Sequence, residues 1–218
     1  MKNLVLTLLV LALPLAMHAQ TTVAVETTGE LKAVLGLKGD AVRGKTAFDD
    51  CAGCHRKDAS GRANIATPRL SGQHASVIIK QIVDIRSGRR INEPMKEYVV
   101  DPAFSLQAFA DIATYLQGLP VAGTIGKGPG SEVARGKDLF ARDCAACHGA
   151  AGEGQGQLFH PMVAAQHYSY VLRELGLIRD GGRGNSSPGM MALIKTYAQA
   201  DLQAVADYIA QLPAPPKQ

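Results

Sequence analysis

The chain has 218 residues, of which 46% are hydrophobic and 5% aromatic, and it contains no tryptophan. This length fits one large domain or two small ones, and the apolar fraction is enough for a packed globular protein. The formal net charge of +4 is too small to indicate binding to nucleic acid, and no basic run is interleaved with aromatic residues.

Residues 1–19 have the pattern of a secretory signal peptide. A short positive segment precedes an apolar run from Leu4 to Leu15, and small residues follow it. The run is short for a bilayer span, so we expect cleavage after Ala19, with an uncleaved membrane anchor as the alternative. Cleavage predicts a periplasmic protein, in which residues 20–39 form an N-terminal extension that is either a short helix or a disordered lead.

Two pentapeptides share the pattern C-x-x-C-H, and together they contain every cysteine of the chain. Their cysteines are Cys51, Cys54, Cys144 and Cys147, and their histidines are His55 and His148. Two thiols three positions apart on one helical turn can both form thioethers to one porphyrin, and the adjacent imidazole then faces the iron. The pattern therefore predicts two covalently bound haem c groups, whose apolar bulk would supplement a core poor in aromatic residues.

Paired cysteines also occur in thioredoxin-like redox motifs and in zinc sites. A redox motif of that kind requires a βαβ context, which this sequence lacks. A shared zinc site is disfavoured because the two pairs lie 93 residues apart, from Cys51 to Cys144, and each is followed directly by histidine.

The two halves of the chain repeat with this same offset of 93 residues. A period of that length indicates tandem domains rather than a solenoid. We assign the domains to residues 40–120 (domain 1) and 132–213 (domain 2), joined by a glycine-rich linker at 121–131 and followed by a tail at 214–218.

Each half predicts three helices and no strands. The first helix leads into the C-x-x-C-H motif, and the second has apolar residues with the i, i+4, i+7 spacing of Ile78, Ile82 and Ile85. The third ends before Pro120 or Pro213, as helices do before proline. The predicted fold class is therefore all-α, in two tandem cytochrome c domains that are each built around one haem.

The second axial position of each haem iron must be filled or left open. Met95 is the only internal methionine of the first half, in a segment expected to be a loop. The matching segment contains Met190 and Met191. Met190 is preferred because it lies 18 residues before Tyr208, against 17 for Met191, while Met95 lies 20 residues before its own tyrosine, Tyr115.

Histidines offer rival ligands. The repeat preserves His74 and His167 at the entry to the second helix, where we expect them to cap the helix or contact solvent, because both halves have methionines. We expect His160 at the surface and Met162 in a packing role.

Two prolines follow the motif histidines at a fixed distance. Pro68 and Pro161 each lie 13 residues after His55 and His148. A backbone carbonyl at this place would accept the Nδ1–H of the histidine, which fixes its tautomer and raises its basicity.

The order of these segments resembles the dihaem cytochrome c4 family. The resemblance rests on the tandem motifs, on the stretches PRLSGQH (68–74) and DIRSGR (84–89), and on the late methionines, and it covers about residues 40–213. It implies that His55 with Met95 and His148 with Met190 are the axial pairs. It also implies periplasmic transfer of electrons from respiratory donors towards terminal oxidases or reductases.

We therefore expect an electron carrier and not an enzyme, soluble or loosely associated with the membrane, whose partners are redox proteins and not nucleic acid. One alternative is a dihaem peroxidase-like enzyme with one open haem site, which carbon monoxide binding would reveal. The other is an electron-transfer subunit dedicated to one dehydrogenase complex, which would co-purify with that complex.

Overall fold

The computed structural model describes residues 29–121 and 125–216, and the predicted signal peptide lies outside these ranges. Strand-like pairing within them is limited to two isolated bridges, Arg62 with Thr67 and Gln155 with His160. The all-α prediction is thus confirmed. In the described part of the chain no helix is long and apolar enough to cross a membrane.

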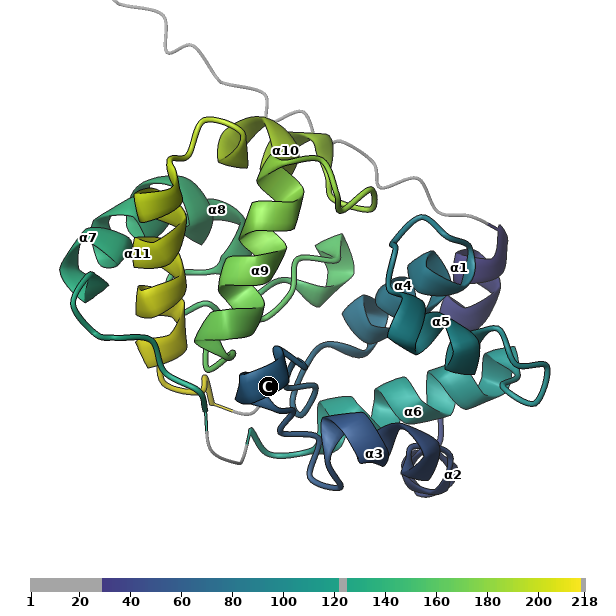
Figure 1. Ribbon diagram of the computed structural model, residues 1–218. Coiled ribbons are helices and arrows are strands. Elements are labelled where there is room, and N and C mark those ends of the chain that lie inside the picture. Colours follow the sequence, from purple (N-terminus) through teal and green to yellow (C-terminus); the bar gives the residue numbers. More distant parts are fainter. Residues whose placement is uncertain (1–28, 122–124, 217–218) are drawn as a thin grey trace, which may run out of the picture.

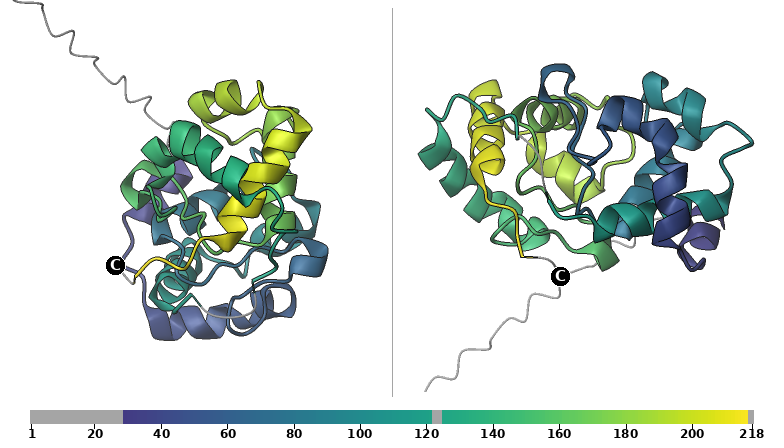
Figure 2. Two further views of the ribbon diagram at one scale, coloured as in Figure 1. Left: turned by 90° about the vertical axis from the view of Figure 1, so that its left-hand side faces the viewer. Right: turned by 90° about the horizontal axis from the view of Figure 1, so that it is seen from below.

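The helices form two bundles that lie side by side, the first purple to teal and the second green to yellow in Figure 1, and the views in Figure 2 show the same division. The first bundle contains α1 (Gly29–Leu35), α2 (Ala41–Ala47), α3 (Asp49–His55), η1 (Ala63–Ile65), α4 (Ala75–Arg86), α5 (Glu93–Val99) and α6 (Leu106–Gly118). The second contains α7 (Val133–Leu139), η2 (Phe140–Cys144), α8 (Ala145–His148), η3 (Gly156–Leu158), α9 (Tyr168–Arg179), α10 (Pro188–Ile194) and α11 (Gln199–Gln211).

In both domains the helix before the haem motif crosses the last helix closely. A Cβ atom added to Gly44 on α2 would lie 2.0 Å from the carbonyl oxygen of Asp111 on α6, and one added to Gly136 on α7 would lie 2.0 Å from that of Ala204 on α11. Only glycine permits this approach of two backbones. The crossings fix the start of each haem motif against the domain core.

We expect Gly44→Ala to lower the free energy of unfolding by about 1–3 kcal/mol or more, because the added methyl group meets backbone that cannot move aside. Denaturant unfolding followed by circular dichroism measures the loss. Gly176→Ala is the matched control, since Gly176 lies inside α9 with nothing within 4 Å of an added Cβ. Alanine has a higher helix propensity than glycine, so Gly176→Ala should not destabilise the protein. Equal losses of unfolding free energy in the two variants would contradict the role of the close crossing.

The haem motif of domain 2 is preceded by one extra residue. Phe48 lies three residues before Cys51, whereas Phe140 lies four residues before Cys144. The structure absorbs this residue in η2, a π-helical turn that domain 1 lacks. Both phenylalanines therefore keep their place beside the last helix, with ring centroids 5.8 Å from Tyr115 and 5.4 Å from Tyr208.

The N-terminal extension contributes a helix to domain 1. α1 buries Leu31 and Val34 completely in the same apolar cluster as Phe48 and Phe109. The short-helix alternative holds for residues 29–35, and the domain 1 core begins before residue 40, where the repeat begins. The described residues before α7, 125–132, form no helix that would match α1, so the repeat does not mark α1 as part of a domain.

The segments that carry the candidate methionines were expected to be loops, and this was wrong. Both are short helices, α5 and α10, and each has proline at one of its first two positions. Proline has no N–H to lose there, and its fixed φ suits the first turn of a helix. The proline of each segment thus lies in the first turn of a helix.

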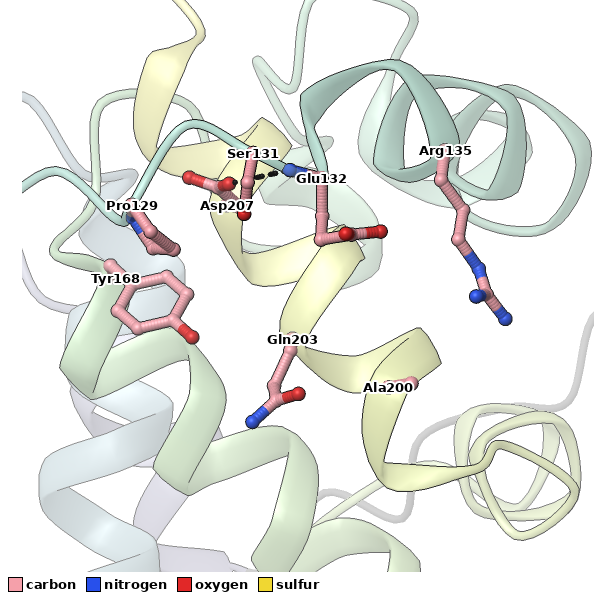
Figure 3. Close-up of a pocket in the computed structure, with 8 residues that line it drawn as sticks. All are labelled: Pro129, Ser131, Glu132, Arg135, Tyr168, Ala200, Gln203 and Asp207. Carbon is pink, nitrogen blue, oxygen red and sulfur yellow. Dashed lines mark hydrogen bonds between the residues drawn. The ribbon is translucent and has the colours of Figure 1, made fainter.

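The end of the linker is fixed to α11 by Asp207. Its carboxylate accepts hydrogen bonds from the backbone N–H of Gly130 (3.0 Å) and of Glu132 (3.2 Å). Figure 3 shows the bond from Glu132. A polar hollow of about 340 Å³ lies beside this contact. It is lined by Pro129, Ser131, Glu132, Arg135, Tyr168, Ala200, Gln203 and Asp207. No haem-motif residue lines it, so we place the functional site elsewhere.

Candidate haem sites

The motif histidines are held by the predicted prolines. His55 ends α3 and is 4% exposed, and its Nδ1 lies 3.1 Å from the carbonyl oxygen of Pro68. In domain 2 the Nδ1 of His148 lies 3.0 Å from the carbonyl oxygen of Pro161. A carbonyl only accepts, so Nδ1 carries the proton and the lone pair is on Nε2.

Burial also favours the neutral form of the two motif histidines. Desolvation lowers the pKa of His55 and of His148 below the ordinary value, although the hydrogen bonds to Pro68 and Pro161 oppose it. Both rings are therefore neutral at pH 7 and present Nε2 as a donor to a metal.

None of the four cysteines, all of which lie within the described residues, forms a disulfide. Cys51 and Cys144 face the domain cores, whereas Cys54 and Cys147 are exposed. Burial raises the pKa of the Cys51 thiol to about 11 and that of Cys144 to about 12. Thiols with such pKa values are poor nucleophiles at neutral pH, unlike the activated cysteine of a thioredoxin-like motif.

The zinc alternative also finds no support. Within residues 29–121 and 125–216, no three side chains of His, Cys, Asp or Glu form a group that could hold a metal ion. The two cysteine pairs remain in separate domains.

The candidate methionines pack against the same clusters as the motif cysteines. Met95 contacts the cluster of domain 1 together with Cys51, and Met190 and Met191 contact the cluster of domain 2, which contains Cys144. Each domain therefore brings a thiol and a thioether to one apolar core, and the motif histidine follows four residues after that thiol in the chain. This donor set fits a covalently attached haem, for which cysteine, histidine and methionine are the expected partners. Met162 is 4% exposed, as expected of a packing residue.

His74 and His167 were expected to cap a helix or to contact solvent, and this was wrong. They occupy the positions before α4 and α9, but neither side chain caps its helix. Instead each Nε2 lies 2.8 Å from a backbone carbonyl of the other domain, that of Glu153 for His74 and that of Ser60 for His167. The physical reason is that both helix starts face the domain boundary.

His160 was expected at the surface, and it is instead half-buried. Its ring lies 6.1 Å from that of His148, and its Nδ1 is buried with no hydrogen-bond partner. The bridge between Gln155 and His160 turns the loop back under the motif histidine. Domain 1 has Thr67 at the matching position, so the two domains differ here.

The domain boundary contains a polar cluster that sequence reasoning missed. Glu174 on α9 accepts hydrogen bonds from Arg90 of domain 1 (3.0 Å) and from Arg183 (2.9 Å), and Gln81 on α4 accepts from both arginines. Arg90 and Arg183 are matched by the 93-residue repeat, as are Gln81 and Glu174. That repeat of polar residues was the signal available in the sequence.

Comparisons with known proteins identify the family of the chain. A family model described as cytochrome c matches residues 41–120 and 133–213. The thiosulfate dehydrogenase electron acceptor of Stutzerimonas stutzeri (strain A1501) is 35% identical over 175 residues, covering 74% of this chain and 78% of that protein. Cytochrome c4 of Pseudomonas aeruginosa is 29% identical over 181 residues, covering 78% of this chain and 88% of that protein.

The fold gives the same result. The crystal structure of reduced recombinant cytochrome c4 from Pseudomonas stutzeri is similar to this chain with a TM-score of 0.72 and 26% identity, over 80% of this chain and all (100%) of that one. Both attachment motifs lie within the residues that the cytochrome c family model matches. The chain therefore belongs to the cytochrome c family, as a dihaem electron-transfer cytochrome of the c4 type that carries two covalently bound haem c groups.

Proposed function

We propose that His55 and Met95 are the axial ligands of the haem in domain 1, and His148 and Met190 those of the haem in domain 2. The observation that carries this proposal is the hydrogen bond from each motif histidine to its proline carbonyl, because it leaves Nε2 as the free donor atom. Cys51, Cys54, Cys144 and Cys147 would be the thioether anchors.

The helix register supports Met190 over Met191. Met95 is the third residue of α5, and Met190 is the third residue of α10. The buried residue Val99 follows Met95 by four positions, and the buried residue Ile194 follows Met190 by the same four. Residues four apart share one helix face, so Met190 presents its side chain as Met95 does.

With these ligands the protein is an electron carrier and not an enzyme. The haems supply one-electron redox chemistry, and methionine ligation favours a high reduction potential. The chain's own residues hold each histidine in one tautomer, keep water from the core and fix the two domains against each other. An electron received in one domain can then leave from the other.

We further propose that the protein is periplasmic and takes electrons from a respiratory donor or a dehydrogenase for delivery to a terminal oxidase or reductase. The signal-like sequence of residues 1–19 supports export. The name of a relative, thiosulfate dehydrogenase electron acceptor, supports a dehydrogenase as the donor.

Optical and magnetic spectra of the purified protein test the ligands. We expect two haems per chain, the weak long-wavelength sulfur-to-iron band in the oxidised form, and no carbon monoxide binding in the reduced form. Carbon monoxide binding or a high-spin signal at one haem would refute closed His/Met sites and would favour the peroxidase-like alternative.

A dedicated subunit is the second candidate, because the same relative is named for one dehydrogenase. Affinity purification from the native membrane and soluble fractions separates the two roles. A stoichiometric dehydrogenase subunit retained at high salt would identify a fixed partner, whereas isolation of the cytochrome alone indicates a free carrier.

A further inference from the structure

We propose that Gln73 and Gln166 are positioning residues that act across the domain boundary, each tuning the histidine ligand of the haem in the other domain. The proposal rests on the axial roles of His55 and His148 proposed above. A side chain of domain 1 thus influences the reduction potential of the haem in domain 2, and a side chain of domain 2 influences that of the haem in domain 1.

The contacts are reciprocal. The side chain of Gln73 in domain 1 accepts a hydrogen bond from the backbone N–H of Met162 (2.9 Å) and donates one to the backbone carbonyl oxygen of Met162 (2.9 Å). The side chain of Gln166 in domain 2 accepts a hydrogen bond from the backbone N–H of Arg69 (2.9 Å) and donates one to the backbone carbonyl oxygen of Arg69 (3.0 Å). All four residues are buried, at 7% exposure or less.

The orientation of each amide is determined by its neighbours. The Oε1 of Gln73 also accepts a hydrogen bond from the N–H of His74 (3.1 Å), and that of Gln166 from the N–H of His167 (3.0 Å). An amide turned the other way would direct its NH₂ group at two N–H donors. Oxygen therefore faces the N–H of Met162 and of Arg69.

Each of these N–H groups belongs to the peptide that holds a motif histidine. The peptide between Pro161 and Met162 accepts from His148 at its oxygen and donates to Gln73 at its nitrogen. The peptide between Pro68 and Arg69 accepts from His55 and donates to Gln166 in the same way. One resonant peptide group thus connects the glutamine of one domain to the histidine of the other.

Hydrogen bonds in such a chain strengthen one another. Donation from the N–H of Met162 places more negative charge on the carbonyl oxygen of Pro161, which then accepts more strongly from the Nδ1–H of His148. A more strongly bonded imidazole is more basic and stabilises the oxidised iron, which lowers the reduction potential. Loss of Gln73 is therefore expected to raise the potential of the haem in domain 2.

The experiment is a redox titration of each haem in the holoprotein, with Gln73→Leu compared to wild type. Met95→His lowers the reduction potential of the domain 1 haem alone, and it therefore shows which step of the titration belongs to which domain. We expect Gln73→Leu to raise the domain 2 potential and to leave domain 1 unchanged, and Gln166→Leu to do the opposite. Gln73→Glu keeps an acceptor oxygen, so the domain 2 potential should stay at or below the wild-type value.

A second readout reports on the hydrogen bond itself. In Gln73→Leu the Nδ1–H proton of His148 should exchange with solvent faster and its resonance should shift, while that of His55 stays in place. If Gln73→Leu does not give folded protein, Gln166→Leu makes the same test in the other direction.

The matched control is Ser76→Ala. Ser76 donates to the carbonyl oxygen of Gly156 across the same boundary (2.6 Å) but does not touch a proline peptide. A shift in Ser76→Ala equal to that in Gln73→Leu would mean a loosened interface and would overturn the proposal, as would a Gln73→Leu shift confined to domain 1 or absent.

Spectra of the wild type distinguish a failure of the proposed axial ligands from a failure of the role proposed for Gln73 and Gln166. A wild type without two His/Met haems refutes the proposed ligands. A wild type with both, combined with a failure of the cross-domain shift, refutes only the role of Gln73 and Gln166.

Discussion

Replacing Met190 with alanine is expected to open one of the two haems. The oxidised protein should lose about half of its sulfur-to-iron band, the reduced protein should bind one carbon monoxide per chain, and the potential of the domain 2 haem should fall. The fall reflects loss of the thioether, because axial ligands set haem potentials over a range of roughly 0.8 V.

Met191→Ala is the matched control for this variant. Both methionines are half-buried against the same core, so the two changes remove similar apolar contacts. They differ in helix register, since only Met190 occupies the third position of its helix, as Met95 does in α5. An open haem in Met191→Ala, with Met190→Ala closed, would transfer the ligand role to Met191.

The features that the sequence predicts correctly depend on short spacings. The C-x-x-C-H motif of domain 1 lies within α3, and the chain from His55 returns at Pro68, 13 residues later, to accept a hydrogen bond from the histidine. Apolar periodicity likewise identifies α4, in which Ile78 and Ile85 are buried. Such local patterns determine local structure without knowledge of the rest of the fold.

The features that were missed depend on two folded domains meeting. Gln73 contacts Met162, and Arg90 contacts Glu174, across 89 and 84 residues of sequence. Glu174 lies on α9, and a polar residue in a helical pattern is ordinarily placed at the solvent-facing side, which is the wrong side when a second domain covers it. The half-buried position of His160 was missed for a related reason, because it follows from the turn at Gln155 and not from the polarity of His160 itself.

The polar cluster at the domain boundary leads to the second large effect. We expect Glu174→Gln to lower the free energy of unfolding by about 3–5 kcal/mol, the range for removing one partner of a buried ion pair. The side chains of Arg90 and Glu174 are each 8% exposed, and Arg183 also donates to Glu174, so the variant leaves two guanidinium groups without their carboxylate. Denaturant unfolding and proteolysis at the linker measure the loss.

The same carboxylate gives the boundary a pH dependence. Burial acts to raise the pKa of Glu174, but Arg90, Arg183 and Arg173 outweigh it and hold the pKa below its ordinary value. A lowered pKa in the folded state contributes stability above the unfolded value, and this contribution is lost as the pH falls through the folded value. The wild type should therefore lose stability at acid pH that Glu174→Gln has already lost.

Asp180→Asn is the control, because Asp180 pairs with Arg179 at the surface, where its side chain is 62% exposed. Exposed pairs contribute little, so this variant should unfold as the wild type does. If Glu174→Gln and Asp180→Asn behave alike, the boundary arginines do not need a carboxylate. If only Glu174→Gln weakens the protein, this one side chain of domain 2 compensates charge from both domains and holds them in the arrangement on which the cross-domain contacts of Gln73 and Gln166 depend.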